Sequence, residues 1–369
     1  MDILILQIKK IAFNCILIFG WNIMANYFDG VDGNIMKYFR ILAGWEIPAR
    51  LIEYVNTKEV LRQQYISLTC GTIYSDLFNS KIFYSNLNHS IWVALIIRNF
   101  THDKKQTLSW LFHDIATPAF KHCIDFFNWD FETQESTEEL TTQIIHNSKE
   151  ITDLLRRDWI LEDEINDYQI YPIADNKSPQ LSSDRFEYTF SNAIFTYEFI
   201  PLHDMIEIYN DVYIWKDENW VDELTFNNLE HAKKFVNFMC KNSIIYIMDK
   251  TRYSMQFIAE MIKYLHDKWL LNKEDLYTLQ EKEIFDILEN TDMKEIFHKR
   301  KDAKEVVVSE NKPEGVFYVN LKSKIRYINP LVNWKRIYDI DEESRKLIDD
   351  VKNYDMSKYV YIPWIVLPK

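Results

Sequence analysis

The chain has 369 residues, of which 47% are apolar and 15% aromatic, so it can bury one large core or two ordinary ones and is not mainly disordered. Its formal net charge of −13 excludes an extended nucleic-acid footprint, because neutralising phosphates requires clustered Lys and Arg. With only 6 Gly and 9 Pro the chain lacks the turn residues that many short strands need, and we expect a mainly α-helical fold.

The N-terminal stretch "IAFNCILIFGW" (11–21) follows two lysines and is similar to the apolar part of a signal peptide. It is too short to span a bilayer and has no convincing cleavage site after it. We therefore expect residues 1–30 to form a buried helical extension with no membrane contact, or the functional domain to begin near Met24. The four cysteines are scattered without CxxC spacing, which indicates neither a zinc knuckle nor a disulfide framework and favours the cytoplasm.

Apolar residues recur at helical spacing in the first part of the chain. Residues 31–69 predict two or three amphipathic helices, with Pro48 in a first turn and Asn56 as the cap of a following helix. The pair Cys70–Gly71 then breaks the pattern. The apolar run 89–100 and the segment 106–115 predict two buried helices joined by the polar turn "THDKK".

Pro118 ends the second of these helices, and a third is expected just beyond it in "AFKHCIDFF" (119–127). Further helices are predicted over three ranges, 132–158, the end of 178–195, and 228–292. Past Arg300 the segments "EVVVSE" and "GVFYVNLKSKIRYI", separated by "NKPEG", predict a β-hairpin. We therefore expect a helical domain over 31–300 and a small α+β appendage over 301–369.

The dipeptide His-Asp occurs four times, and one occurrence stands out. His102–Asp103 lies in a polar run, and the pairs at 203 and 266 lie on amphipathic segments. His113–Asp114 interrupts the apolar "LSWLFHDIA", where burying an unpaired charge costs several kcal/mol. A divalent cation would compensate this pair, since imidazole and carboxylate together are common metal ligands.

Further ligands must come from elsewhere in the chain. His89 opens the preceding buried helix, and two antiparallel helices joined by a short turn can bring it close to residue 113. Asp184, in "SSDRFEYTF", is another carboxylate in an apolar helix. A single buried histidine is usually a hydrogen-bonded core residue, but four of the nine histidines fall between residues 89 and 122. The combination favours a metal site.

The order His89, His113–Asp114, Asp184 resembles the H…HD…D signature of the HD-domain metal-dependent phosphohydrolases, and most closely the branch of the deoxynucleoside triphosphate triphosphohydrolases. The resemblance covers about residues 55–195 and the basic segment 322–332, and rests on "HDIATPAFKHCID" and "DRFEYTFSN". It implies an HD-domain helical bundle in which a divalent ion (Mn, Fe, Zn, Ni or Mg) is held by His89, His113, Asp114 and Asp184. It also implies self-association into a homo-oligomer.

The resemblance also implies roles for other residues. His122 and Asp125 match a catalytic pair, and their spacing places both on one helix face, with Glu135 as a further partner. The residues expected to contact a small phosphorylated substrate, such as a nucleotide, are Arg185, Tyr188, Asn192, Lys324 and Arg326, with Arg336 as a further candidate. For the last three, an exposed strand face is an equally good interpretation.

Several positions depart from the family pattern. Thr117 stands where a second histidine is usual, Asn86 replaces an arginine, Gln134 replaces a histidine, and Asn192 replaces an aspartate. The expected function is hydrolysis of a phosphoester or phosphoanhydride bond by a metal-activated water. The alternatives are a nucleotide-binding or regulatory protein with weakened turnover, and a helical scaffold whose buried His-Asp groups are only hydrogen-bonded.

Overall fold

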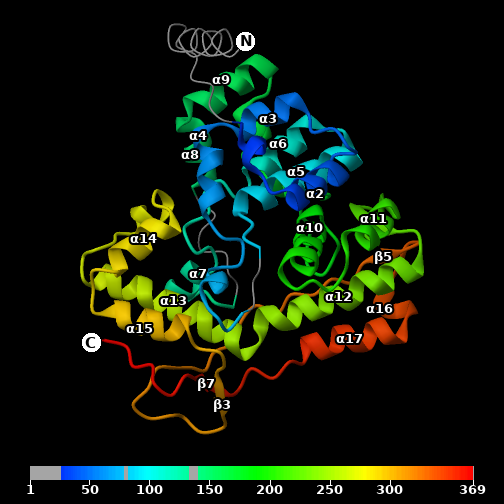
Figure 1. Ribbon diagram of the computed structural model, residues 1–369. Coiled ribbons are helices and arrows are strands. Elements are labelled where there is room, and N and C mark those ends of the chain that lie inside the picture. Colours follow the sequence, from blue (N-terminus) through cyan, green and yellow to red (C-terminus); the bar gives the residue numbers. More distant parts are fainter. Residues whose placement is uncertain (1–25, 79–81, 133–139, 369) are drawn as a thin grey trace, which may run out of the picture.

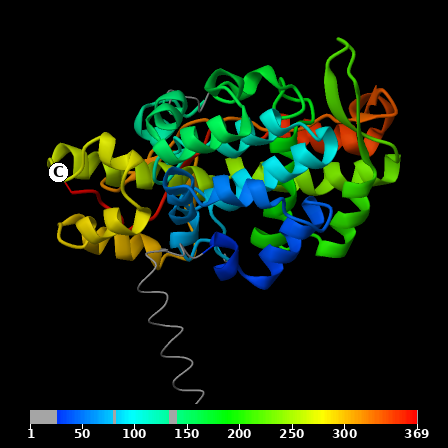
Figure 2. The same ribbon diagram turned by 90° about the horizontal axis from the view of Figure 1, so that it is seen from above.

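The computed structural model describes residues 26–78, 82–132 and 140–368. In these residues the protein is mainly helical, with two small sheets, which confirms the predicted fold class. Figures 1 and 2 show the helices packed around two long ones, α12 (Leu229–Ile247) and α13 (Asp249–Asp267), which follow each other across the molecule. Most of the predicted N-terminal extension lies outside the described residues.

The other helices before α12 are α2 (Gly33–Leu42), α3 (Ala49–Val55), α4 (Lys58–Leu61), α5 (Asn86–Thr101), α6 (Lys104–Phe112), α7 (Cys123–Phe127), α8 (Thr141–Asn147), α9 (Lys149–Asp158), α10 (Ser183–Ser191) and α11 (Leu202–Asn210). Those after α13 are α14 (Glu281–Leu288), α15 (Met293–Lys301), α16 (Ile337–Ile340) and α17 (Glu342–Lys352). Short 3-10 turns are η1 (Tyr27–Gly30), η2 (Arg62–Tyr65), η3 (Thr72–Tyr74), η4 (Glu162–Glu164), η5 (Tyr168–Ile170) and η7 (Glu274–Tyr277), and η6 (Asn192–Thr196) is a π-helical turn.

Helices α5 and α6 form the antiparallel pair that the apolar runs predicted. The hydroxyl of Ser85 accepts the backbone N–H of Asn88 at 3.2 Å, and the Asn88 side chain accepts the N–H of Ser85 at 2.8 Å, which fixes the start of α5. His102 ends α5 in a left-handed conformation, and Asp103 caps α6. The reversal brings the start of α5 beside the end of α6.

The helix expected directly after Pro118 begins later than predicted, at Cys123. Phe120 and Lys121 have φ angles of 65° and 46°, which a right-handed helix cannot contain. The expectation was wrong because apolar spacing does not reveal such a turn. Of the predicted helical range 132–158, the described part forms α8 and α9.

The sheets are small and lie toward the C-terminal half. One has the order β1-β2-β5-β6, in which β1 (Val212–Lys216) and β2 (Asp222–Phe226) are antiparallel, β2 is parallel to β5 (Leu331–Val332), and β5 is antiparallel to β6 (Lys335–Arg336). The other has the order β3-β7-β4, with β3 (Val307–Ser309) and β4 (Tyr318–Val319) both antiparallel to β7 (Tyr359–Tyr361).

The predicted C-terminal β-hairpin is corrected in one respect. Its two strands exist as β3 and β4, but they do not pair with each other, because β7 lies between them. The segment after residue 301 is also joined to the helical part, since β5 pairs with β2 and α17 packs on α12. In Figure 1 this segment runs along the underside of α12 and α13.

Two large hydrophobic cores support the fold in the described residues. The first gathers buried side chains from α2, α5, α10 and α12, with Phe186 and Phe235 among them. The second lies between α7, α13 and α14, with Phe120 and Phe257 among its members. Phe120 belongs to the turn that follows the His-Asp motif, so this turn is anchored in the second core.

The buried carboxyl group of Glu281 connects α14 to that turn. It is 0% exposed and accepts the backbone N–H groups of Ser67 and Phe120, each at 3.1 Å, and the hydroxyl of Tyr74 at 2.6 Å. Burial raises the pKa of Glu281 from 4.5 to about 7, although these hydrogen bonds lower it. Glu281 is therefore a polar junction inside an apolar core.

Glu281→Gln is expected to remove a pH dependence of stability. Because the folded protein binds the Glu281 proton more tightly than the unfolded chain, the free energy of unfolding falls as pH rises from 4.5 to about 7. This contribution is on the order of 3 kcal/mol. Urea unfolding at about pH 5 and about pH 8 measures it, and the difference between the two pH values should be smaller in the variant than in the wild type. An equal difference in both proteins would contradict the prediction.

Candidate metal centre

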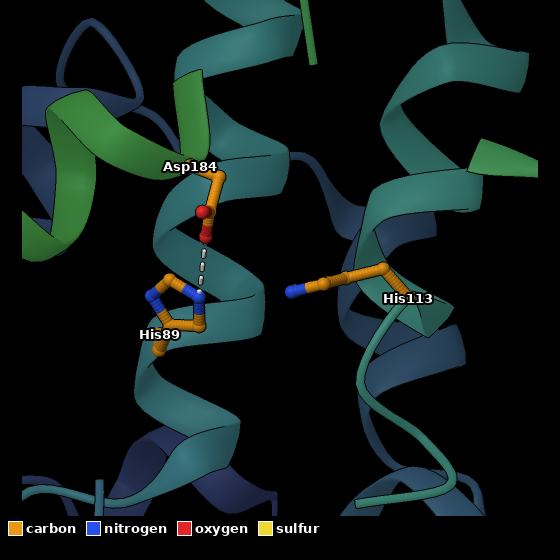
Figure 3. Close-up of side chains that lie close together, drawn as sticks. All are labelled: His89, His113 and Asp184. Carbon is orange, nitrogen blue, oxygen red and sulfur yellow. Dashed lines mark ion pairs between the residues drawn. The ribbon is translucent and has the colours of Figure 1, made fainter. Parts of the chain in front are cut away.

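His89 lies in the first turn of α5 between two carboxylates of α10. Its Nε2 atom is 3.0 Å from Oδ1 of Asp184, and its Nδ1 atom is hydrogen-bonded to Oε2 of Glu187. Asp184 and Glu187 are one turn apart on α10, which begins at the Ser182 cap. Figure 3 shows the ring of His89 facing the Asp184 carboxylate. The side chain is buried, and both ring nitrogens have an acidic partner.

His113 follows directly after α6 and points toward the same space (Figure 3). Its Nδ1 atom is 2.7 Å from the carbonyl oxygen of Trp110. The imidazole of His113 also stacks on the Trp110 ring, with centroids 4.4 Å apart. The Nδ1–H group donates to this carbonyl, which leaves the lone pair of Nε2 for a ligand. Burial lowers the pKa of His113, so the neutral ring is favoured.

The three residues His89, His113 and Asp184 meet closely enough to hold one ion. Each offers one ligand atom, and these atoms all lie within 4.8 Å of one another. Ligand atoms that surround a transition metal at about 2.0–2.2 Å are separated by distances of this order. Two imidazoles and a carboxylate suit zinc, iron, manganese or nickel, so the donor set fits the predicted divalent cation.

The pKa of His89 shows how strongly the site attracts positive charge. Burial alone would lower this pKa, but the carboxylates of Glu187 and Asp184 outweigh it and raise the pKa to about 10. Without a metal, the imidazolium is therefore the cation between the two carboxylates. Binding of a metal ion at Nε2 requires the loss of that proton.

Asp114, the fourth predicted ligand, lies at the edge of the three-residue group. Its Oδ2 atom is 3.6 Å from Nε2 of His113 and 3.0 Å from Nζ of Lys121. Burial would raise the pKa of Asp114, but the neighbouring His113, Lys121 and His89 hold it far below its usual range. The carboxylate is ionised and adjacent to the group, and its role as a ligand stays a prediction.

Glu187 was not predicted from the sequence. It is 0% exposed and ties Nδ1 of His89, which is the role that carboxylates take behind metal-bound histidines. Its remaining oxygen, Oε1, has no hydrogen-bond partner among the described residues. The available signal was an acidic residue three positions after Asp184, which places both carboxylates on one face of the helix.

The predicted catalytic pair is in contact. Nδ1 of His122 is 2.9 Å from Oδ2 of Asp125, whose side chain is fully buried, whereas the His122 side chain is 38% exposed. Burial lowers the pKa of His122 although Asp125 raises it, and the positive charges of Arg326 and Lys121 lower it further. His122 is therefore a neutral, accessible imidazole oriented by Asp125. Glu135 and Gln134 lie outside the described residues.

The predicted substrate residues on α10 and η6 already have partners within the protein. Arg185 forms hydrogen bonds with Asn176 at 2.7 Å and Ser182 at 3.0 Å, and an ion pair with Asp175 at 2.9 Å. The amide of Asn192 donates to the carbonyl oxygen of Tyr188 at 2.8 Å.

Asn192 also accepts the hydroxyl of Tyr84 at 2.7 Å and donates to the hydroxyl of Tyr246 at 2.9 Å. The rings of Tyr188 and Tyr246 meet edge to face, with centroids 6.2 Å apart. Asn192 therefore links Tyr84 to Tyr246 by hydrogen bonds, and Tyr246 contacts the ring of Tyr188.

The C-terminal basic residues divide into two groups. Lys324 and Arg326 lie on the extended segment between β4 and β5, and the charge of Arg326 lowers the pKa of both His122 and Tyr188. Arg336 instead bonds to Glu223 at 2.7 Å and Glu218 at 2.6 Å. Arg326 is thus electrostatically coupled to the site, whereas the guanidinium of Arg336 is neutralised at the sheet.

The comparisons with known proteins concern the fold. No protein-family model matches the chain. The protein named "Uncharacterized protein YdhJ" from Bacillus subtilis (strain 168) is 24% identical over 280 residues, which cover 74% of this chain and 83% of that one. A crystal structure of a hypothetical protein from Aquifex aeolicus is similar with a TM-score of 0.56 and 13% identity, over 86% of this chain and 93% of that one. This likeness shows a shared fold.

None of the helices in the described residues has an apolar stretch long enough to cross a bilayer.

Glu187→Gln is expected to weaken metal binding about 10–100-fold, because an amide orients His89 but no longer raises its basicity. Titration calorimetry with Mn²⁺ measures the dissociation constant. The control is Glu162→Gln, which alters the carboxylate that pairs with the exposed His146 at 2.9 Å. Equal affinities in wild type and Glu187→Gln would contradict the assignment.

Proposed function

We propose that this protein is a metal-dependent phosphohydrolase that cleaves a phosphoester or phosphoanhydride bond, with nucleotides as the substrate class. The supporting observation is the convergence of His89, His113 and Asp184, from three separate helical segments, to within 4.8 Å. These are three of the four residues that the resemblance to HD-domain phosphohydrolases implies as metal ligands. A cytoplasmic location and a homo-oligomeric assembly belong to the same proposal.

Each residue of the centre has a defined task in this proposal. His89, His113 and Asp184 hold the cation, with Asp114 as the fourth ligand and Glu187 orienting His89. When bound, a divalent cation lowers the pKa of a coordinated water and withdraws charge from a phosphoryl oxygen. The deep burial of the His89 and Glu187 side chains keeps this region at low dielectric, which strengthens the interaction between charges.

His122 moves protons in the proposed reaction. Its Nδ1–H group donates to Asp125, so the lone pair of Nε2 faces away from that carboxylate. Nε2 can accept a proton from the attacking water and return it to the leaving oxygen. Asp125 stabilises the imidazolium that forms between these two transfers. The positive charge of Arg326, which acts on His122, also favours an anionic substrate nearby.

One observation favours the alternative of a nucleotide-binding regulatory protein. Arg185 is already bonded to Asn176, Ser182 and Asp175, so the guanidinium is less available for a phosphate group. Asn86, Thr117 and Gln134 also differ from the family pattern. These differences and the bonded state of Arg185 indicate weaker binding of a triphosphate. Such a protein would still bind the metal ion and a nucleotide but would not hydrolyse the nucleotide efficiently.

The proposal predicts Mn²⁺-dependent release of phosphate, pyrophosphate or triphosphate from at least one member of a panel of nucleotides. His113→Ala should lower this rate at least about 100-fold, because the cation loses a ligand. His146→Ala, which alters an exposed histidine, should retain the rate.

Three other outcomes would contradict hydrolysis at this centre. Mn²⁺-dependent nucleotide binding without product would support the regulatory alternative. Purified protein that binds neither metal nor nucleotide would be a structural scaffold. Equal rates in His113→Ala and wild type would place the activity at a different site.

A further inference from the structure

Lys121 brings a buried positive charge to the metal centre. Its side chain is 9% exposed, and its Nζ atom is 3.0 Å from Oδ2 of Asp114 and hydrogen-bonded to Oδ1 of Asn86. Buried lysines are rare in proteins unless they are paired. The turn that carries Lys121 has left-handed backbone at Phe120 and Lys121, and Glu281 accepts the N–H of Phe120. The fold therefore holds this lysine at the site through an otherwise unfavourable turn.

Asn86, the hydrogen-bond partner of Lys121, occupies a position where the family pattern has a positive charge. Residue 86 is where the resemblance expects an arginine three positions before the first metal histidine. Asn86 has no charge, but its Oδ1 atom accepts the Lys121 ammonium and its Nδ2 atom donates to Gln63 at 2.7 Å. The positive charge of Lys121, in the turn after Pro118, thus lies beside the uncharged side chain of Asn86.

We propose that Lys121 is a substrate-positioning residue that binds a phosphate oxygen and replaces the positive charge missing at Asn86. This inference rests on the proposed phosphohydrolase function and specifies how the substrate is held. A lysine ammonium has three N–H donors, and Asp114 and Asn86 take two of them among the described residues. The third is available for an oxygen of a polyphosphate chain.

Lys121→Met is expected to weaken binding of inorganic tripolyphosphate, measured by calorimetry with saturating Mn²⁺, about 10-fold or more. In a hydrolysis assay it should raise KM more than it lowers kcat. Adding Asn86→Arg to Lys121→Met should recover at least half of the loss, because the charge returns from the neighbouring position. Lys105→Met, which removes a surface ion pair with Glu164, is the control and should bind like wild type.

The outcomes separate this inference from the proposed function. Mn²⁺ binding and far-UV circular dichroism like those of wild type show that Lys121→Met is folded. Unchanged tripolyphosphate affinity in that variant, or no tripolyphosphate binding by wild type, overturns the role of Lys121. Hydrolysis by wild type decides the phosphohydrolase proposal on its own, whatever the result for Lys121.

A second inference comes from the tryptophans, whose backbone is unusual at six positions. These tryptophans have φ angles between 59° and 80° and are 66% to 92% exposed. Bulky residues rarely adopt the left-handed region, and glycine adopts it without a steric cost. The six are Trp45, Trp129, Trp159, Trp220, Trp269 and Trp334.

Three of them end helices in the way that glycine usually does. Trp129, Trp159 and Trp269 each precede a residue whose N–H group bonds to the carbonyl oxygen five positions earlier. This is the Schellman motif, in which the left-handed residue is usually glycine. The three bonds are Asp130 to Asp125 at 2.7 Å, Ile160 to Leu155 at 3.0 Å, and Leu270 to Leu265 at 2.9 Å.

Two others lie in hairpin turns that also favour glycine. Asn333 and Trp334 form the two-residue loop between β5 and β6, and both have positive φ, as in a type I′ turn, where Asn-Gly is strongly preferred. Trp220 donates to the carbonyl oxygen of Asp217 at 3.1 Å in the β1–β2 loop. Its left-handed conformation after a turn is the glycine position of a bulged hairpin.

Composition gives the same indication. The chain has 6 Gly and 11 Trp, whereas a glycine fraction of about 7% is usual. Trp92 and Trp110 behave differently, because they are buried in right-handed helices and stack on Phe195 and His113. Tryptophan therefore packs in the protein interior at these two positions, whereas it is largely exposed to solvent at the other six.

We infer that the fold is built for glycine at these six positions and that the source organism inserts glycine there. The simplest cause is a single codon, UGA, which some genetic codes read as tryptophan and others as glycine. The buried Trp92 and Trp110 would then be encoded by UGG. This inference is independent of the metal centre.

Peptide mass spectrometry of the protein purified from its source tests the inference directly. Glycine is expected at the six positions and tryptophan at 92 and 110, and tryptophan at the six would overturn the inference. In recombinant protein, replacing Trp159 and Trp269 together by glycine should raise the melting temperature by about 1 °C per position. An unchanged or lower melting temperature would show that the backbone at these positions is not built for glycine.

Discussion

The arrangement of the centre depends on the buried imidazole of His89, held between Glu187 and Asp184. Two carboxylates at 0% and 25% side-chain exposure cannot remain ionised together in a buried site without a positive charge. In the free protein the imidazolium supplies that charge, and in the proposed enzyme a divalent cation shares it. The helices α5 and α10 are therefore coupled by electrostatics as well as by apolar packing.

Much of this arrangement could be predicted from the sequence because it depends on local signals. The interruption of an apolar helix by His113–Asp114 and the position of His89 at the start of another such helix identified the first two residues of the group. The pairing of His122 with Asp125 was implied by the family resemblance, and their three-residue spacing is compatible with one face of a helix. The mainly helical fold followed from apolar periodicity and the scarcity of turn residues.

What could not be predicted depends on contacts between distant segments. The ammonium of Lys121 reaches Asp114 because Phe120 and Lys121 adopt left-handed backbone conformations. The spacing of residues in the sequence does not predict such a turn. Strands β3 and β4 have the composition of a hairpin, but each of them pairs with β7, which lies between them. Arg185 was expected at a phosphate group, whereas the loop 175–182 supplies enough oxygen atoms to satisfy its guanidinium.

The central position of β7 has a consequence for biosynthesis. Strands β3 and β4 precede it in the chain, and each uses β7 as its partner. During synthesis, the backbone groups of these two segments have no strand partner in this sheet until residues 359–361 have been added. The three-stranded sheet therefore cannot form before β7 has been synthesised, and β7 follows the helices of both cores in the chain.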